Sequence, residues 1–316
     1  MINSPICGIL GIEKPLFQGG MAWIADANLA AAVSNAGGLG IISAVNGGAQ
    51  AVRAEIRKAR ELTRKPFGVN IMLAAPDAAD IARVVLEEGV DIVTTGAGSP
   101  APYMEAWKAA GVRVIPVVAS VAYALKVEQL GATAVIAEGA ESGGHVGELH
   151  TLALVPQVVD AVHIPVLAAG GICDGRGAAA AFLLGACGVQ VGTRFLVADE
   201  CRVHPVYKER LVKATDIGTM VTGKSLGDAV RSLKTPFSKQ FARMEADPSV
   251  TPEQLRAFGT GSLRKAVFDG DLAGGSFLAG EAAGMITRTE PAAAIVDDII
   301  QGAEALLKEA NKLIKN

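Results

Sequence analysis

Eight short apolar runs recur along the sequence, and each begins 20 to 33 residues after the one before it. Longer Ala-rich stretches with the apolar spacing of amphipathic helices lie between them, and several end in Gly, as helices often do. Apolar runs that alternate with helical stretches are typical of β–α units in a parallel sheet. The predicted strands begin at Pro15, Leu39, Pro66, Val90, Val112, Ala132, Pro165 and Gly188.

Eight units of similar length favour a closed (β/α)8 barrel, because an open doubly wound sheet usually has about five or six strands and a change in connection length. The repeat stops near residue 198, and short helical segments, loops and prolines follow. A single amphipathic helix is predicted from Glu290 to Lys315. We therefore predict an α/β TIM barrel of residues 1–198 and 290–316, with an inserted helical cap of residues 199–289 over the C-terminal ends of the strands.

Composition argues against several classes of partner. The 29 Lys and Arg residues are balanced by 32 Asp and Glu residues, so the net charge of −3 gives no electrostatic reason to expect nucleic acid or an anionic membrane. The four cysteines form no CxxC pair, so neither a disulfide framework nor a metal site is predicted. No apolar run reaches the ~18 residues of a membrane span, and no signal sequence is evident, so we predict a cytoplasmic protein.

Glycines and small polar residues follow the predicted strands, at the rim where barrel enzymes carry their active sites. Gly170 and Gly171 follow the seventh strand, and Gly192 and Thr193 follow the eighth. Each Gly pair taken alone is explained by turn geometry. Because both occur after the two strands that commonly form a phosphate site in such barrels, they favour a phosphate-bearing ligand.

Three further residues are candidates for chemistry. His145 follows Gly143 and Gly144 beyond the sixth strand, where a flexible loop can bring an imidazole over a bound ring; the alternative is a structural or solvent-exposed histidine. Asn70 and Glu138 end the third and sixth strands, where they can hydrogen-bond the edge of a cofactor or, equally, cap turns. The remaining histidines fall in helical or connecting segments, and we interpret them as structural.

Seven segments, taken in order, resemble the flavin-dependent enoyl-acyl-carrier-protein reductase II family and, more broadly, its nitronate monooxygenase relatives. They are FQGGMAW from Phe17, GGLGII from Gly37, PFGVNIM from Pro66, VTTGAG from Val93, AEGAESGGHVG from Ala137, PVLAAGGI from Pro165 and QVGTRF from Gln190. The resemblance implies that FMN is the phosphate-bearing ligand. It also implies NADH or NADPH as electron donor, an enoyl substrate carried by acyl carrier protein, a homodimer and, in related reductases, a monovalent cation.

The resemblance also assigns the residues around the flavin. It places the phosphate on Gly170, Gly171, Gly192 and Thr193, beside Gln190. It places the isoalloxazine ring against Gly20, Met21 and Ala22, surrounded by Asn70, Glu138, Gly143 and Gly144, with His145 as the catalytic residue.

The choice within this superfamily depends on few positions. Nitronate monooxygenases usually carry Gln at the position of Glu138, whereas the reductases usually carry AEGxEAGGH; here the segment is AEGAESGGH, with Ser142 in place of the common Ala. We therefore expect an enoyl reductase, with a nitronate-oxidising enzyme and a flavin-binding protein without turnover as the alternatives. No GxGxxG follows the first strand, so the sequence has no separate nicotinamide fingerprint.

Overall fold

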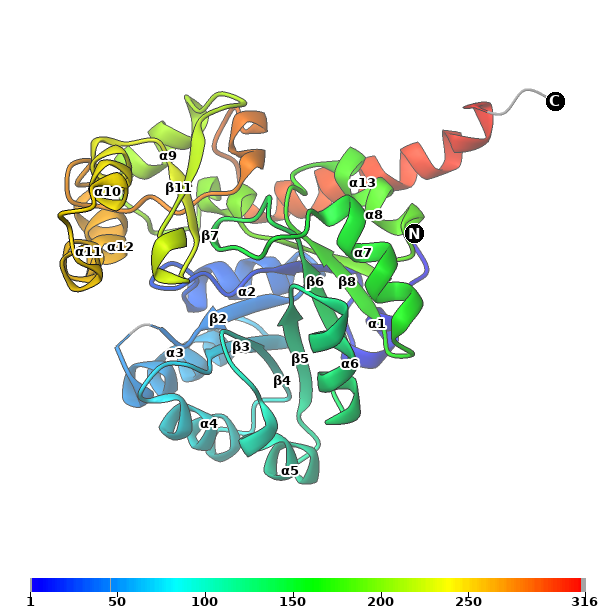
Figure 1. The fold of residues 1–316 in the computed structure, drawn as a ribbon. Coiled ribbons are helices and arrows are strands. Elements are labelled where there is room, and N and C mark those ends of the chain that lie inside the picture. The colour runs from blue at the N-terminus through cyan, green and yellow to red at the C-terminus, as the bar shows by residue number, and fades with distance from the viewer. Residues whose placement is uncertain (1, 46, 314–316) are drawn as a thin grey trace.

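The computed structural model describes residues 2–45 and 47–313, and within them eight parallel strands form one sheet (Figure 1). The order of neighbours is β1-β9-β8-β6-β5-β4-β3-β2, and a parallel bridge between Phe17 and Leu39 joins the first strand to the second. The sheet therefore closes on itself, which confirms the predicted TIM barrel. Its strands are β1 (Leu16–Gln18), β2 (Gly40–Ser43), β3 (Phe67–Met72), β4 (Ile92–Gly96), β5 (Arg113–Val118), β6 (Val135–Glu138), β8 (Val166–Ala169) and β9 (Gly188–Val191).

Helices alternate with these strands and surround the sheet. The last helix packs between the helices that follow β8 and β1, so it takes the eighth place in the ring although the insertion separates it from β9. The helices of the ring are α2 (Ala27–Asn35), α3 (Ala49–Leu62), α4 (Ala78–Glu87), α5 (Ala101–Ala109), α6 (Val121–Gln129), α7 (Thr151–Ala161), α8 (Gly175–Leu183) and α13 (Ala292–Glu309). None of the described helices combines the length and the apolar character needed to span a lipid bilayer.

Polar caps start several helices close to the strand ends. Asp26 accepts the backbone N–H groups of Asn28 and Leu29, both at 3.0 Å, at the start of α2. Asp174 caps α8 and Ser120 caps α6 in the same way. Since a capped helix leaves fewer unsatisfied amides, each cap fixes where its helix begins and how short the preceding loop is.

Large aliphatic side chains fill the inside of the barrel. The helix α1 (Pro5–Leu10) adds Ile6 and Leu10 to this cluster, and Ser4 beside it donates a hydrogen bond to the carbonyl of Cys187 at the start of β9. The N-terminal end of the barrel is therefore covered, whereas the C-terminal rim is open to a ligand. The strand residues in the cluster include Phe17, Leu39, Ile41, Ile92, Ile115, Ile136 and Leu167.

The sequence predicted only helices and loops for the segment between β9 and α13, but the structure also has strands there. Its strands β10 (Thr219–Thr222) and β11 (Val230–Leu233) pair with each other, and β11 also pairs with β7 (Gly144–His145), from the loop after β6, in an antiparallel sheet. Both strands have four residues, too few for their alternation to be distinguished from a loop. In Figure 1 the yellow and orange parts of this insertion gather in a lobe to one side of the barrel.

The insertion also contains several short helical segments. After η1 (Thr193–Val197), which follows β9, its elements are α9 (Pro205–Val212), β10 (Thr219–Thr222), η2 (Lys224–Leu226), β11 (Val230–Leu233), α10 (Pro236–Ala246), α11 (Pro252–Gly259), α12 (Ser262–Arg264), η3 (Lys265–Asp269) and η4 (Glu281–Met285).

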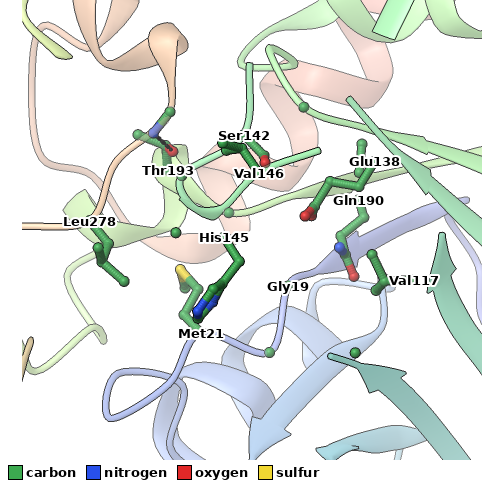
Figure 2. A pocket seen from close by; sticks show the side chains of 18 of the residues that line it. Gly19, Met21, Val117, Glu138, Ser142, His145, Val146, Gln190, Thr193 and Leu278 are labelled. Carbon is green, nitrogen blue, oxygen red and sulfur yellow. Dashed lines mark hydrogen bonds between the residues drawn. The ribbon is translucent and has the colours of Figure 1, made fainter. Parts of the chain in front are cut away.

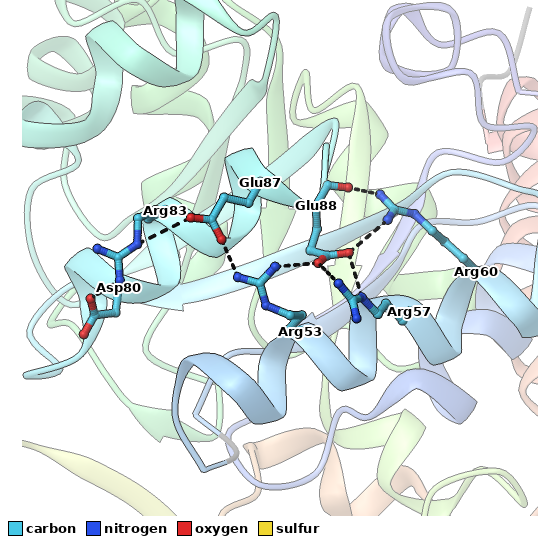
Figure 3. A network of polar contacts seen from close by, with 7 residues as sticks. All are labelled: Arg53, Arg57, Arg60, Asp80, Arg83, Glu87 and Glu88. Atoms are coloured by element: carbon cyan, nitrogen blue, oxygen red, sulfur yellow. Dashed lines mark hydrogen bonds and ion pairs between the residues drawn. The ribbon is translucent and has the colours of Figure 1, made fainter.

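A carboxylate between two neighbouring helices is surrounded by arginines (Figure 3). Glu88, directly after α4, keeps 8% of its side chain exposed and lies 2.7 Å from Arg53, 2.9 Å from Arg57 and 3.5 Å from Arg60, all on α3. Hydrogen bonding from Arg57, followed by that from Arg53, lowers the pKa of Glu88 below its usual value. The charged form of this side chain therefore stabilises the contact between α3 and α4.

We expect Glu88→Gln to lower the free energy of unfolding at pH 7. Because the pKa is lowered in the folded protein, the stabilisation is present above pH 4.5 and is lost as the pH falls further. Urea titrations at pH 7 and near pH 3 measure both values. The control is Glu61→Gln, an exposed change on α3, the helix that carries the three arginines. An equal loss at both pH values in Glu88→Gln would contradict the role of the charge.

Candidate active site

A cavity of about 560 Å³ lies at the C-terminal ends of the strands. The loops after β1, β3, β6, β8 and β9 form most of its wall, and the insertion adds Leu278, Gly280 and Ala282. Figure 2 shows side chains from these segments converging on one space. All the residues predicted for the site line it: Gly20, Met21, Ala22, Asn70, Glu138, Gly143, Gly144, His145, Gly170, Gly171, Gln190, Gly192 and Thr193.

The two turns predicted to hold a phosphate differ in shape. Gly170 and Gly171 follow β8 with φ values of 95° and 73°, a left-handed conformation that favours glycine. Gly192 follows β9 with an ordinary φ of −108°, and a Cβ placed there meets nothing closer than Met21 Sδ at 3.9 Å. Within the described part of the chain, the amides of Gly171 and Gly192 donate no hydrogen bond. These turns therefore offer N–H groups and open space to an anion.

Two residues that the sequence analysis did not select hold the first of these turns in place. Thr151 Oγ1 lies 3.0 Å from the carbonyl oxygen of Gly170 and 2.9 Å from Glu141 Oε2, while the same carboxylate accepts the Thr151 N–H at 2.9 Å. A Cβ on Gly170 would come within 2.7 Å of the Gly139 carbonyl. Glu141 lies inside the AEGAESGGH segment, and its position in that motif is the sequence signal that could have identified it.

Asn70 is oriented by its neighbours. Its Oδ1 accepts a hydrogen bond from Thr94 Oγ1 at 2.8 Å, and its Nδ2 donates to the Gly20 carbonyl at 3.3 Å. A Cβ on Gly20 would lie 2.1 Å from the Asn70 Cβ, so only glycine permits this approach of the β1 loop to β3. The amide group therefore has a fixed position on the wall of the cavity.

Glu138 ends β6 and points into the same space as Gln190 (Figure 2). Burial raises the pKa of its carboxyl to about 7, because the charged form is poorly solvated there. The nearby Ser142 hydroxyl lowers this pKa, but by less than burial raises it. The hydroxyl makes no hydrogen bond of normal geometry among the described residues. Near neutral pH the group is thus divided between an acid that donates a hydrogen bond and a carboxylate that accepts one.

His145 lies on β7, and its exposed ring points towards Met21 in Figure 2. Its Nε2 lies 2.9 Å from Asp228 Oδ1, a carboxylate of the insertion. On the neighbouring wall, Thr193 Oγ1 accepts the Gly280 N–H at 2.9 Å, so the loop after β9 is also tied to the insertion. No pattern in the sequence placed residues of the insertion at the site, because their positions depend on long-range packing.

We expect the ligand-free protein to lose stability as the pH rises from about 4.5 to above 7. A raised folded pKa means that the folded protein binds more protons than the unfolded chain in this interval, so ionisation of Glu138 opposes folding by up to about 3 kcal/mol. Glu138→Gln should remove most of this dependence in thermal melts from pH 5 to 8. The control is Glu148→Gln, an exposed change on the same loop. An unchanged pH profile in Glu138→Gln would contradict the assigned burial.

Comparisons with known proteins agree with this geometry. The model of the nitronate monooxygenase family matches residues 3–85 and 81–302. Among solved structures, FabK from Thermotoga maritima is 48% identical with a TM-score of 0.97, covering 99% of this chain and 100% of that chain. Nitroalkane oxidase from Streptomyces ansochromogenes is 29% identical with a TM-score of 0.82, covering 96% and 98%.

The name of one curated relative gives a carboxyl-CoA compound as its substrate. This relative is the (3aS,4S,5R,7aS)-5-hydroxy-7a-methyl-1-oxo-octahydro-1H-indene-4-carboxyl-CoA dehydrogenase of Mycobacterium tuberculosis, 42% identical over 237 residues, which are 74% of this chain and 67% of the relative. The family match extends over most of the sequence, from the first strand to the last helix. This chain belongs to the nitronate monooxygenase family.

Proposed function

We propose that this protein is an FMN-dependent enoyl-[acyl-carrier-protein] reductase that uses NADH or NADPH to reduce trans-2-enoyl thioesters. The observation that carries the proposal is the 48% identity to FabK, an enoyl-acyl-carrier-protein reductase II, over essentially the whole chain. The Mycobacterium relative, named for a carboxyl-CoA substrate, supports a thioester as the class of substrate. Membership of the family supports a flavin oxidoreductase more generally.

The residues of the cavity fit FMN. Gly171 and Gly192 provide free amides and open space for one phosphate, and the volume of about 560 Å³ falls in the usual range for a cofactor site. Met21 and Ala22 provide an apolar wall for a planar ring, and Asn70 and Glu138 provide hydrogen-bonding groups for its edge. When bound, the flavin would supply two-electron hydride chemistry between the nicotinamide and the enoyl group.

His145 is the residue that we assign to catalysis. Reduction of an enoyl thioester adds hydride at the β-carbon, and the resulting enolate-like charge needs a proton at the α-carbon or a hydrogen-bond donor at the carbonyl oxygen. An imidazole on the cavity wall can serve in either way. Residues 199–289 would act as a cap that limits the access of water and oxygen to the reduced cofactor.

Nitronate oxidation is the second candidate, and the family model and the nitroalkane oxidase neighbour favour it. The two activities differ in their electron donor, since a reductase takes hydride from a nicotinamide and a nitronate oxidase takes electrons from its substrate. Anaerobic mixing with NADH or NADPH separates them by the loss of oxidised flavin absorbance. A cytoplasmic location, a homodimer and a monovalent cation remain parts of the proposal.

We expect Gly192→Leu to fold but to retain little FMN. The backbone conformation of Gly192 allows a side chain, and the leucine has room there. The new side chain should therefore occupy space for the ligand without disturbing the packing of the protein. Flavin released by heat, measured against protein concentration, gives the occupancy. Gly8→Leu, which also adds a side chain where a Cβ meets nothing within 4 Å, is the control outside the cavity. Stoichiometric FMN in Gly192→Leu would mean that the phosphate site lies elsewhere.

We expect His145→Ala to keep FMN and to lose at least ~100-fold in enoyl reduction, the lower end for removal of a general acid or an oxyanion donor. Stopped-flow measurements of flavin reduction by NADH and of reoxidation by a crotonyl thioester assign the defect to one half-reaction. Rates near those of the wild type in both halves would exclude His145 from the mechanism.

A further inference from the structure

The insertion holds the backbone on both sides of the imidazole. In the ladder between β7 and β11, Val230 lies opposite His145 and Arg231 lies opposite Gly144. The Val146 N–H continues this contact by donating to a carbonyl just before β11, at 3.0 Å. His145 is therefore placed by residues that follow the barrel strands in the sequence, and the loop after β6 does not position it alone.

Asp228 reaches the ring from a turn that is itself fixed. Its N–H donates to the Gly223 carbonyl at 3.1 Å, and the Gly223 N–H donates to Glu245 Oε2 on α10 at 3.0 Å. Gly223 has a φ of 82°, which favours glycine, and a Cβ there would lie 2.4 Å from the Asp228 carbonyl. The backbone that carries the Asp228 carboxylate is thus held in place, and Oδ1 of this carboxylate lies 2.9 Å from Nε2 of His145.

The other charged groups near this loop are engaged elsewhere. The Arg231 guanidinium contacts the Ala140 carbonyl at 3.1 and 3.2 Å and Glu281 at 3.0 Å. Glu141 accepts hydrogen bonds from Thr151, and Glu138 lies at the end of β6. Across residues 2–45 and 47–313, Asp228 is the carboxylate within ion-pair distance of His145, and Nδ1 of the ring has no hydrogen-bond partner.

We propose that Asp228 is a positioning residue that holds His145 at Nε2 and leaves Nδ1 to serve the substrate. The proposal rests on the proposed function of the site. A carboxylate beside Nε2 favours the proton on that nitrogen and limits rotation of the ring. NADH or NADPH supplies the hydride that reaches the β-carbon, the imidazolium gives its Nδ1 proton to the α-carbon, and solvent restores that proton. The neutral ring left after transfer carries its proton on Nε2, next to Asp228.

The exposure of the His145–Asp228 pair limits how much the loss of Asp228 can change the reaction rate. His145 and Asp228 keep 57% and 62% of their side chains exposed. Ion pairs of this kind contribute at most about 1 kcal/mol and weaken in salt, which corresponds to about a fivefold change in rate. Asp228→Asn keeps a hydrogen-bond acceptor but removes the charge, so it separates orientation from attraction.

The kinetic test compares Asp228→Ala and Asp228→Asn with wild-type holoenzyme. Crotonyl-N-acetylcysteamine, an uncharged thioester, reoxidises the NADH-reduced enzyme in anaerobic stopped flow, first at low salt and then in about 1 M KCl. We expect Asp228→Ala to slow this step threefold to fivefold at low salt, with flavin reduction by NADH unchanged. Asp228→Asn should recover part of the rate and lose the wild-type sensitivity to salt. The control is Asp216→Asn, an exposed carboxylate change on the same insertion.

A second measurement does not depend on activity. The nitrogen shifts of ¹⁵N-labelled histidines report which ring nitrogen carries the proton, and His145→Ala identifies the resonance among the four histidines. We expect the Nε2–H form of neutral His145 in the wild type and a mixture of both forms in Asp228→Ala. An unchanged tautomer or an unchanged reoxidation rate in Asp228→Ala would overturn the proposal. A wild-type enzyme that reduces no enoyl thioester would instead overturn the proposed function, and the tautomer would still report on Asp228.

Discussion

Closure of the parallel sheet between β1 and β2 is the constraint on which the site depends. The bridge from Phe17 to Leu39 joins β1 to β2, which stand at the two ends of the strand order, so all the strand ends meet at a single rim. The aliphatic interior and α1 cover the opposite end. Residues as distant in sequence as Gly20 and Gly192 therefore line one cavity, and short glycine-containing turns are sufficient to shape it.

The insertion completes this rim through buried polar contacts. Arg194, directly after Gly192 and Thr193, forms a buried ion pair with Glu290 just before the last helix, so both ends of the insertion are joined where it leaves and re-enters the barrel. Removing one member of such a pair is costly, because the other charge stays buried. Together with the β7–β11 ladder, this pair connects the insertion to the barrel.

Local patterns in the sequence were sufficient for the barrel and for most of the cavity wall. The spacing of the apolar runs determines the strand number, and the strand ends determine which residues reach the rim, so the sequence alone was enough to select Asn70, Glu138 and Gly171. Asp228 and Thr151 could not be selected in this way, because their places result from contacts that form only in the folded chain, whereas Glu141 had its position in the AEGAESGGH segment as a signal. The strands β10 and β11 were missed for the same reason, since β11 pairs with the His145 loop and β10 pairs with β11.

The stoichiometry of one reaction tests the proposed enoyl thioester reduction most directly. Purified holoenzyme, kept free of oxygen, is given NADH or NADPH and a crotonyl thioester, and both the nicotinamide and the acyl product are measured. We expect nicotinamide to be consumed beyond one equivalent per flavin only when the thioester is present, with one saturated acyl thioester formed for each further nicotinamide oxidised. Flavin that is not reduced by either nicotinamide but is reduced by an alkyl nitronate would contradict it.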